Sequence, residues 1–447
     1  MKKTIKDIII IGAALFAMFF GAGNLIFPPA IGVMGADHWL LSFAGFFITG
    51  ICLPILGVLA VSKAGGTINH MADKVSKTFS LILGTVIVLA IGPLLAIPRT
   101  GATVYEIGVK PLLSVHPLIV SVVYFAVVLF FVIKPSGIVD KIGKILTPIL
   151  LLVIGLIIYK GVAYPIGSPI ASQLTNPFSD GFIQGYQTMD TLGAILIGGI
   201  ILTGIVEKGY LSRKEQMKMA GFSGILAGVL LAGVYGGLLY LGATISGVVD
   251  PSTPKADLIV FITNKLLGAS GQLVMCVAVS AACLTTSIGL TAIVGTYFEK
   301  LSNGKLSYKA IVIGTCVFSA IMGAVGVDTI VNIAVPFLVL SYPVVIVLIV
   351  FNMLDYFIPH NYGYVGGVIG ALIIGCFDAL KTIQLAFIMD LVKSLEPVYT
   401  AINKLPLANM GFSWIVPSLV LAVVGCIIGK AFGKPTEKTI MEVDMTL

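Results

Sequence analysis

Residues 19–29 read Phe19-Phe20-Gly21-Ala22-Gly23-Asn24-Leu25-Ile26-Phe27-Pro28-Pro29, with apolar residues on both sides. Each of the two glycines weakens a helix by roughly 1 kcal/mol relative to alanine. Backbone groups freed by a break are costly in hydrocarbon unless a partner satisfies them. This stretch therefore predicts a membrane helix that is interrupted at mid-depth, where its unwound backbone faces a cavity and binds a ligand or an ion.

The composition around this stretch is that of a membrane protein. Of the 447 residues, 58% are hydrophobic and 11% are charged, and the mean hydropathy is +1.08. A soluble globular chain carries about 25% charged residues. Apolar stretches long enough to cross a bilayer recur along the chain, so we predict an all-α polytopic membrane protein. We expect about twelve transmembrane helices, at residues 8–34, 39–62, 79–104, 117–133, 145–164, 187–206, 217–243, 270–297, 308–325, 328–351, 363–380 and 412–430.

The distribution of basic residues among the loops indicates the membrane topology. The net charge is +7, and most Lys and Arg residues fall in the segments that lie inside if the N-terminus is cytoplasmic. By the positive-inside rule both termini are then cytoplasmic, and the first span stays in place as an anchor. The basic excess is explained without a nucleic-acid partner. The six cysteines all lie in predicted spans and form no CxxC pair, so we expect small packing residues and no organic cofactor.

A second polar interruption opens the sixth span, Gln187-Thr188-Met189-Asp190-Thr191-Leu192-Gly193-Ala194. The first and sixth spans cross the membrane in opposite directions. Broken helices at corresponding positions of two halves indicate an inverted-repeat transporter with its site at the repeat interface. We predict a 5+5 inverted repeat with broken helices 1 and 6 plus two additional helices. The divisions are 1–165 and 180–351 for the repeats, 360–431 for two peripheral helices and 432–447 for a cytoplasmic tail.

The two breaks carry the polar chemistry. The half-helix after the first break offers N–H groups and a positive dipole end, which suit a carboxylate. The half-helix before it offers unpaired carbonyls, which suit Na⁺, and Asn24 adds a side-chain oxygen. In the sixth span, Asp190 is a mid-membrane carboxylate that either binds a cation, a proton or the substrate amine, or pairs with Arg99. Arg99 is the only arginine in a predicted span, and the two readings of Asp190 are compatible.

The eighth span carries three consecutive hydroxyls, in Ala282-Cys283-Leu284-Thr285-Thr286-Ser287-Ile288. A hydroxyl in a membrane helix commonly bonds back to the preceding turn. Three together are typical of oxygen ligands for a hard cation, and carbonyls of the first span would complete the site. Both interpretations stay open on the residues alone.

The first break, the third-span stretch Gly92-Pro93-Leu94-Leu95-Ala96-Ile97-Pro98-Arg99-Thr100 and the sixth-span break resemble the branched-chain amino acid:cation symporters (the LIVCS family) over nearly the whole chain. That family resembles the amino-acid–polyamine–organocation superfamily with the leucine-transporter fold. The resemblance implies Na⁺-coupled uptake of leucine, isoleucine and valine across a bacterial inner membrane, with Na⁺ as the co-transported ion.

The resemblance also implies site residues. Sodium would be bound by the carbonyls of Ala17 and Phe20 and by the hydroxyls of Thr285 and Thr286. We expect the substrate to be bound by the two breaks, at Phe20, Gly21, Ala22, Gly23, Asn24, Thr188, Thr191 and Leu192. The arginine of the sodium-symporter first-helix motif is absent, because Ile26 is followed directly by Phe27.

The expected function is therefore secondary active transport by alternating access, with an amino acid and the lipid bilayer as partners. A variant couples to H⁺ through Asp190. A membrane enzyme or a channel is disfavoured, because the four histidines are scattered and the polar residues cluster at one depth rather than along a pore. Preference among the three amino acids and the oligomeric state depend on pocket shape and surfaces, which spacing does not define.

Overall fold

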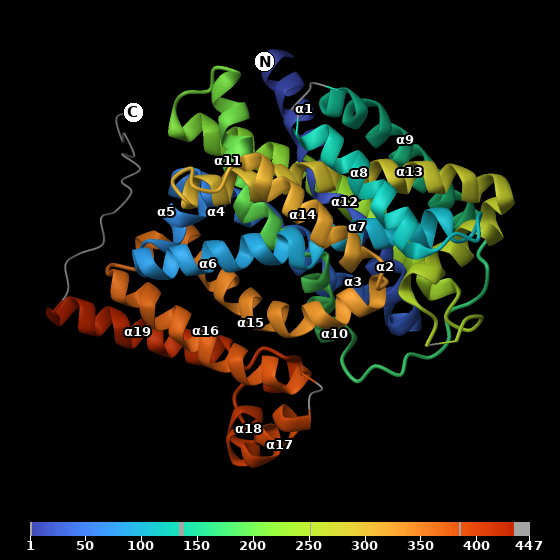
Figure 1. The fold of residues 1–447 in the computed structure, drawn as a ribbon. Helices are drawn as coiled ribbons and strands as arrows, with labels where there is room; N and C mark the ends of the chain where they lie inside the picture. The colour runs from blue at the N-terminus through green and yellow to red at the C-terminus, as the bar shows by residue number, and fades with distance from the viewer. Residues whose placement is uncertain (1, 134–137, 251, 384–385, 433–447) are drawn as a thin grey trace.

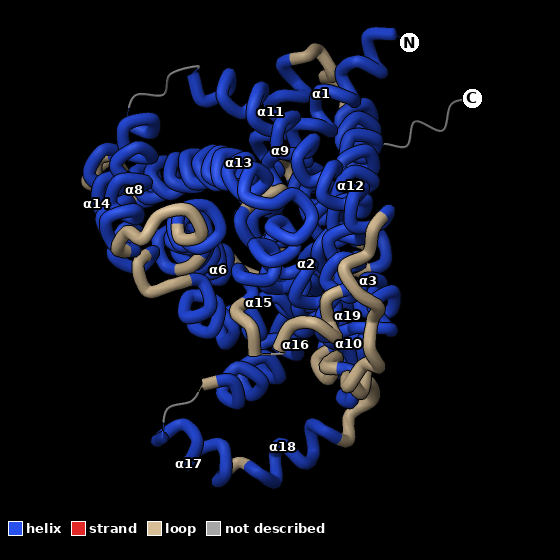
Figure 2. Tube along the Cα trace, turned by 90° about the vertical axis from the view of Figure 1, so that its right-hand side faces the viewer, coloured by secondary structure: helices blue, strands red, loops and turns tan. Residues whose placement is uncertain are grey.

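A computed structural model describes residues 2–133, 138–250, 252–383 and 386–432. The secondary-structure elements in this part are all helices (Figures 1 and 2). Every predicted span coincides with helical structure, which confirms the all-α membrane fold. Seven helical stretches of the described part are long and apolar enough to cross a bilayer, and shorter apolar helices accompany them.

The predicted first half contains five helical spans, three of them divided into two helices each. They are α1 (Lys2–Phe19) with α2 (Ala22–Gly35), α3 (Trp39–Phe47) with α4 (Leu53–Ala64), α6 (Lys77–Leu89) with α7 (Ala96–Thr103), α8 (Pro117–Ile133), and α9 (Ile138–Ala163). Single π-helical segments join α3 to α4 and α6 to α7, at Ile48–Cys52 and Ala90–Leu94. Such π segments are frequent at functional sites, and both lie next to the interrupted helices described below.

The predicted second half follows the same plan. Its spans are α10 (Pro177–Gly185) with α11 (Asp190–Glu207), α12 (Arg213–Thr244), α13 (Lys255–Leu301), α14 (Tyr308–Gly323) and α15 (Val327–Met353). Helix α13 is longer than predicted, because residues 255–267 form an additional helical arm. Gly268 separates that arm from the span, with φ 65° in the left-handed region where glycine is favoured.

Both predicted interruptions are present. Helix α1 ends at Phe19, and α2 begins at Ala22 after Gly21, whose backbone is extended. Helix α10 runs into a 3₁₀ turn at Tyr186–Thr188, and α11 begins at Asp190 after Met189, which has φ 61°. A left-handed conformation at a non-glycine residue is uncommon, and it turns the chain sharply between the two half-helices.

Glycines set two matching close contacts between the halves. A Cβ atom on Gly242 of α12 would lie 2.0 Å from the Pro29 carbonyl oxygen of α2. In the same way a Cβ on Gly45 of α3 would lie 1.9 Å from the Phe178 carbonyl oxygen of α10. Small residues allow such close backbone approach in membrane helix pairs. The first span thus packs on the seventh as the sixth packs on the second, which is the relation that an inverted repeat requires.

The last two spans form a pair at the edge of the molecule. Helices α16 (Asn361–Thr382) and α19 (Ile415–Phe432) run side by side (Figure 1). Between them, the connection that joins the two predicted spans contains two short helices, α17 (Ala386–Ser394) and α18 (Glu396–Asn403), which project from the body (Figure 2). The residue boundaries given above for the repeats stay a prediction, and residues 433–447 of the predicted tail lie outside the described residues.

Candidate functional site

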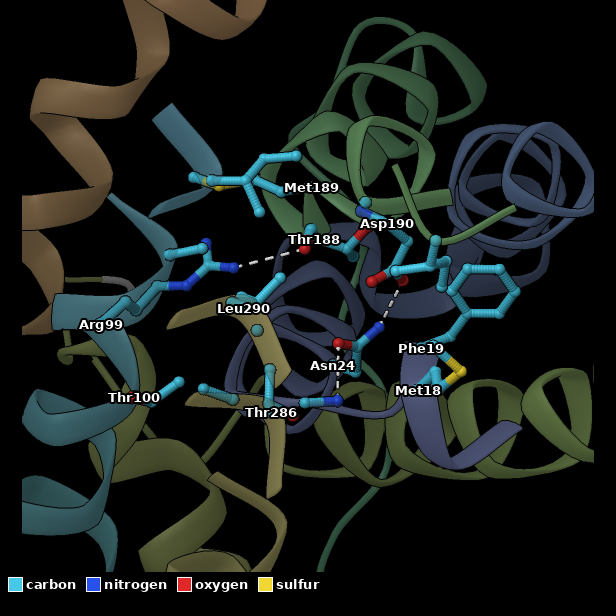
Figure 3. A pocket seen from close by; sticks show the side chains of 17 residues that line it. Met18, Phe19, Asn24, Arg99, Thr100, Thr188, Met189, Asp190, Thr286 and Leu290 are labelled. Atoms are coloured by element: carbon cyan, nitrogen blue, oxygen red, sulfur yellow. Dashed lines mark hydrogen bonds between the residues drawn. The ribbon is translucent and has the colours of Figure 1, made fainter. Parts of the chain in front are cut away.

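The two interruptions border one cavity of about 60 Å³, shown in Figure 3. A cavity needs about 10–15 Å³ to hold one water molecule, so this one is well above that minimum. Its lining comes from spans one, three, six and eight: Met18, Phe19, Gly21, Ala22, Gly23, Asn24, Ile91, Ala96, Arg99, Thr100, Thr188, Met189, Asp190, Gly193, Ile197, Thr286 and Leu290. Most predicted substrate residues are therefore at the cavity.

Asn24 joins the two breaks. Its Oδ1 accepts a hydrogen bond from the Gly21 N–H at 3.1 Å, which caps the start of α2. Its amide nitrogen donates to Asp190 Oδ2 at 2.6 Å and also contacts the hydroxyl of Tyr235. All of these groups are buried. One side chain thus fixes the first break locally and ties it to the sixth span.

The same cap frees the carbonyls predicted to bind sodium. In a continuous helix the Gly21 N–H would donate to the Ala17 carbonyl, but it donates to Asn24 instead. The Asn24 N–H would likewise reach the Phe20 carbonyl, but it donates to the Gly21 carbonyl at 3.2 Å. Both predicted carbonyls therefore lose their regular helical donors, which leaves their lone pairs for another partner.

The hydroxyls of the eighth span divide between two environments. Thr285 and Thr286 both donate to the Ala282 carbonyl, at 2.9 and 3.1 Å, so the predicted bond to the preceding turn does form. A donating hydroxyl still offers its lone pairs, and three oxygens are thereby gathered on one turn. Thr286 borders the cavity beside Gly21, whose hypothetical Cβ would lie 3.4 Å from Thr286 Oγ1.

The Ser287 hydroxyl is bonded to other helices and not to the oxygens of Thr285, Thr286 and Ala282. Its Oγ lies 2.5 Å from Thr100 Oγ1 and accepts from the Tyr124 hydroxyl at 3.0 Å. Thr100 in turn donates to the Ile97 carbonyl at 2.6 Å. This buried network links the third, fourth and eighth spans directly behind the cavity wall. The sequence placed Ser287 among candidate cation ligands, whereas the structure gives it hydroxyl partners from other helices.

Arg99 is held by the sixth-span break. It is 3% exposed, and its Nη1 and Nη2 atoms donate to the carbonyls of Gln187 at 2.6 Å and Thr188 at 3.3 Å. The guanidinium also lies over the Phe27 ring at 5.5 Å. Within the described residues Arg99 forms no ion pair, and its Nε has no partner. The direct Arg99–Asp190 pair considered from the sequence is not formed, although both side chains border the same cavity (Figure 3).

Besides Ala17, whose predicted contribution is its carbonyl, four predicted residues do not border the cavity with their side chains. Thr191 is fully buried and donates to the Thr49 carbonyl at 3.3 Å, and Leu192 is packed in the core. On α11 the cavity face is formed by Asp190, Gly193 and Ile197, whose spacing of three and four residues repeats one helical face. Thr191 and Leu192 therefore point elsewhere, which corrects their predicted place.

The side chains of Phe20 and Thr285 also do not border the cavity. The Phe20 ring stacks between Phe16, at 5.3 Å between centroids, and Tyr235, at 6.1 Å. Only its backbone is at the break. Thr285 lies one position before Thr286 on α13, on the neighbouring face. Both keep a predicted role through the oxygens described above, and neither side chain lines the cavity.

The sequence reasoning missed the apolar wall. Ile91, Ala96, Ile197 and Leu290 come from three different spans and line the cavity with aliphatic surface. Nothing in their local sequence distinguishes them from residues that pack against other helices or lipid. The π segment at Ala90–Leu94, with its Gly92–Pro93 pair, is the only nearby signal, because such irregularities frequently mark functional positions.

Two helices interrupted around a shared cavity define the class: a helical membrane transporter with the leucine-transporter fold. MhsT in complex with L-phenylalanine aligns with a TM-score of 0.53 and 18% identity, over 95% of this chain and 98% of that chain. Mhp1, a nucleobase-cation-symport-1 family transporter in a closed conformation with bromovinylhydantoin bound, aligns with a TM-score of 0.57 and 15% identity, over 95% and 93%. These likenesses establish the fold alone.

The chain belongs to the family of branched-chain amino acid transport proteins, whose family model matches residues 4–432. The branched-chain amino acid permease BraB of Bacillus subtilis (strain 168) is 36% identical over 433 residues, which cover 95% of this chain and 96% of that protein. The predicted family is thereby confirmed. This is a multi-pass membrane transporter and not an enzyme.

Proposed function

We propose that this protein takes up leucine, isoleucine and valine by symport with Na⁺, using alternating access around the cavity between the two breaks. The family and the name of the relative BraB support branched-chain amino acids as cargo. The observation that carries the coupling proposal is the set of oxygens at the first break: two carbonyls without their helical donors beside the hydroxyl turn of α13. Neutral oxygens of this kind suit a hard cation.

The substrate's polar head binds at the start of α2 and at the sixth-span break. The first N–H groups of a helix have no helical acceptor and sit at the positive end of its dipole, so Ala22 and Gly23 offer donors to a carboxylate. Asp190 and Thr188 offer acceptors to the amine. The cavity volume of about 60 Å³ matches the head group more closely than a whole leucine. The aliphatic side chain of the substrate is accommodated when Ile91, Ile197 and Leu290, which form the apolar wall, move outward.

Sodium binds between α1 and α13 in this proposal. Its ligands are the carbonyls of Ala17 and Phe20, the hydroxyls of Thr285 and Thr286, and the Ala282 carbonyl that those hydroxyls already contact. Because the first break shapes both this site and the substrate site, occupation of one stabilises the other. That shared element is the physical basis of coupling.

Uptake of labelled leucine into proteoliposomes tests the proposal. An inward Na⁺ gradient is expected to drive accumulation, and an equal K⁺ gradient is not. Uptake should fall in competition with isoleucine and valine and persist with lysine or glutamate. Equal accumulation without any Na⁺ would refute the coupling ion, and no leucine uptake under any gradient would refute the cargo.

Asp190 supports a second candidate, H⁺ coupling. It is 8% exposed, and within the described residues it forms no ion pair. A buried carboxylate without a cation is stabilised by binding a proton. A pH gradient in Na⁺-free buffer separates the two: leucine accumulation driven by that gradient alone supports proton coupling, and its absence supports Na⁺.

The place of action proposed is the inner membrane of a bacterium, with both termini cytoplasmic. The charge asymmetry of the loops supports this orientation. Labelling of single cysteines placed at the exposed residues Leu211 and Leu113 in a cysteine-free background tests it, because these positions fall on opposite sides in the predicted topology.

A further inference from the structure

The sixth-span break presents its carbonyls to an arginine rather than to open space. Carbonyls at the end of an interrupted membrane helix can bind a cation. In this protein Gln187 and Thr188 already accept from Arg99, which reaches them from α7 of the third span. The cation at this break is therefore part of the chain, and it is fixed in position by two hydrogen bonds.

In the described part of the chain, Arg99 has no carboxylate in direct contact. Its guanidinium is almost fully buried, its contacts are neutral carbonyls and one aromatic ring, and its Nε finds no acceptor. A buried charge without an opposite charge is strongly unfavourable. Among the described residues no carboxylate comes within ion-pair distance of it. Asp190 borders the same cavity but forms no ion pair with Arg99, so a carboxylate bound in the cavity would supply the direct counter-charge.

The geometry places such an anion beside the first break. A Cβ atom on Gly23 would lie only 2.8 Å from Arg99 Nη2, so the guanidinium reaches the start of α2 where free N–H groups point outward. Both border the cavity. Asp190 lies on the other side of the cavity from Arg99 and is occupied by the Asn24 amide, as Figure 3 shows. Opposite charges thus face one small polar space from two sides.

We propose that the Arg99 guanidinium is the counter-charge for the carboxylate of the transported amino acid, so that Arg99 and the start of α2 hold the carboxylate while Asp190 holds the amine. This inference rests on the proposed function, whose substrate it orients. It assigns to Arg99 a substrate-binding role that is separate from the sodium site. It also explains why residue 23 is a glycine, since a Cβ atom there would push the Arg99 guanidinium away from the start of α2.

Competition binding to the purified protein tests the proposal. The probes are L-leucine and L-leucinamide, which keeps the amine and the side chain and loses the carboxylate charge, at a pH where both amines are protonated. The wild type is expected to prefer leucine strongly. Arg99→Gln should weaken leucine binding by roughly 30-fold or more and bring the two affinities within a few-fold of each other. Arg99→Lys keeps the charge without the planar geometry, so it should retain part of the preference.

Two further variants separate this role from a structural one. Arg213→Gln removes the other arginine, which donates to the Lys63 carbonyl at 2.9 Å away from the cavity, and should leave the preference unchanged. Asp190→Asn should weaken both ligands, because both carry the amine, and keep their ratio. A leucine-to-leucinamide ratio in Arg99→Gln equal to that of the wild type would overturn the proposal, and so would a wild type that binds both ligands equally.

A failure of the proposed function would give a different binding result from a failure of the Arg99 proposal. If the wild type binds no branched-chain amino acid but does bind another amino acid, that amino acid and its amide replace the leucine pair, and the Arg99 test proceeds unchanged. If Arg99→Gln does not fold, Arg99→Lys and the wild-type ratio still decide the question.

Discussion

The side-chain amide of Asn24 donates to Asp190 Oδ2 across 2.6 Å, which joins the broken first span to the broken sixth span at one buried point. The two residues are 166 positions apart in the sequence. The same asparagine caps Gly21, so the conformation of the first break and its attachment to the second depend on a single side chain. A substrate that engages Asp190 will therefore be sensed at both breaks.

Asn24→Ala tests this link. It removes a hydrogen bond to a buried carboxylate, which contributes about 1.5–3 kcal/mol to stability. We expect a lower melting temperature in detergent and leucine uptake reduced roughly tenfold or more, since each 1.4 kcal/mol corresponds to a factor of ten. Tyr235→Phe removes only a hydroxyl that contacts the same amide and should have a smaller effect. Equal effects of the two variants would argue against Asn24 as the link between the breaks.

Thr286→Ala tests the proposed sodium site. The loss of one oxygen ligand should raise the Na⁺ concentration for half-maximal leucine uptake by roughly 5- to 30-fold, the equivalent of about 1–2 kcal/mol. Thr296→Ala is the matched control: Thr296 lies on the same helix and donates to the carbonyl four residues earlier, at 2.9 Å, but it is exposed. An unchanged Na⁺ dependence in Thr286→Ala would remove this hydroxyl from the site.

Gly193→Ala probes the size of the cavity. Gly193 borders the cavity, and a Cβ added there meets nothing within 4 Å. The new methyl group therefore occupies part of the proposed substrate space. One methylene in an apolar pocket changes discrimination by roughly 10- to 200-fold. We expect leucine and isoleucine to lose at least about tenfold in affinity and valine to lose less.

Gly204→Ala is the control for this substitution. Gly204 is on the same helix, is equally free of neighbours and lies away from the cavity, so it reports the gain in helix propensity alone. Competition by the three amino acids against labelled leucine gives the comparison. An equal loss for all three in Gly193→Ala would mean that Gly193 does not contact the side chain.

Asp7 makes the start of α1 sensitive to pH. Its carboxylate accepts from Lys208 at 3.1 Å and from the Tyr210 hydroxyl at 3.0 Å. The hydrogen bond from Lys208 holds the pKa of Asp7 below its ordinary value of 3.8, helped by the bond from Tyr210 and the charge of Lys208. A carboxylate whose pKa is lower in the folded state contributes stability that is fully present above the ordinary pKa. That contribution is lost as the pH falls through the lower, folded value.

Thermal unfolding of Asp7→Asn measures this contribution. The variant should melt below the wild type near neutral pH, and the difference should shrink once the pH falls below the ordinary pKa of 3.8. Asp390→Asn, in an exposed pair with Lys393 whose side chains are 76% and 78% accessible, should match the wild type throughout. A difference between Asp7→Asn and the wild type that is constant with pH would assign the effect to packing.

Helix positions and the two breaks were predictable because their causes are local. Apolar length sets where the chain can cross a bilayer, and the glycines and asparagine of the first break and the threonine and aspartate beside Met189 have low helix propensity. The prediction that the breaks mark the site also needs only the rule that irregular membrane backbone lines a cavity. The family follows from the same stretches.

The partners of the charged and polar groups were decided by the tertiary structure. Arg99 was considered as the partner of Asp190, because a sequence shows only that two opposite charges share a depth. In the folded protein the carbonyls of Gln187 and Thr188 reach Arg99 first, since the left-handed turn at Met189 directs them toward the third span.

The cavity face of α11 was likewise set by packing. The sequence placed Thr191 and Leu192 at the site together with Asp190, but adjacent helical residues point in different directions. Rotation of α11 against the second span buries Thr191 on the Thr49 carbonyl and turns Gly193 and Ile197 to the cavity. The sequence by itself therefore determined that this chain is a membrane transporter with two broken helices, because hydropathy and helix-weakening residues act locally. Only the tertiary structure decided which side chains face the cavity, because that depends on how each helix is rotated against its neighbours.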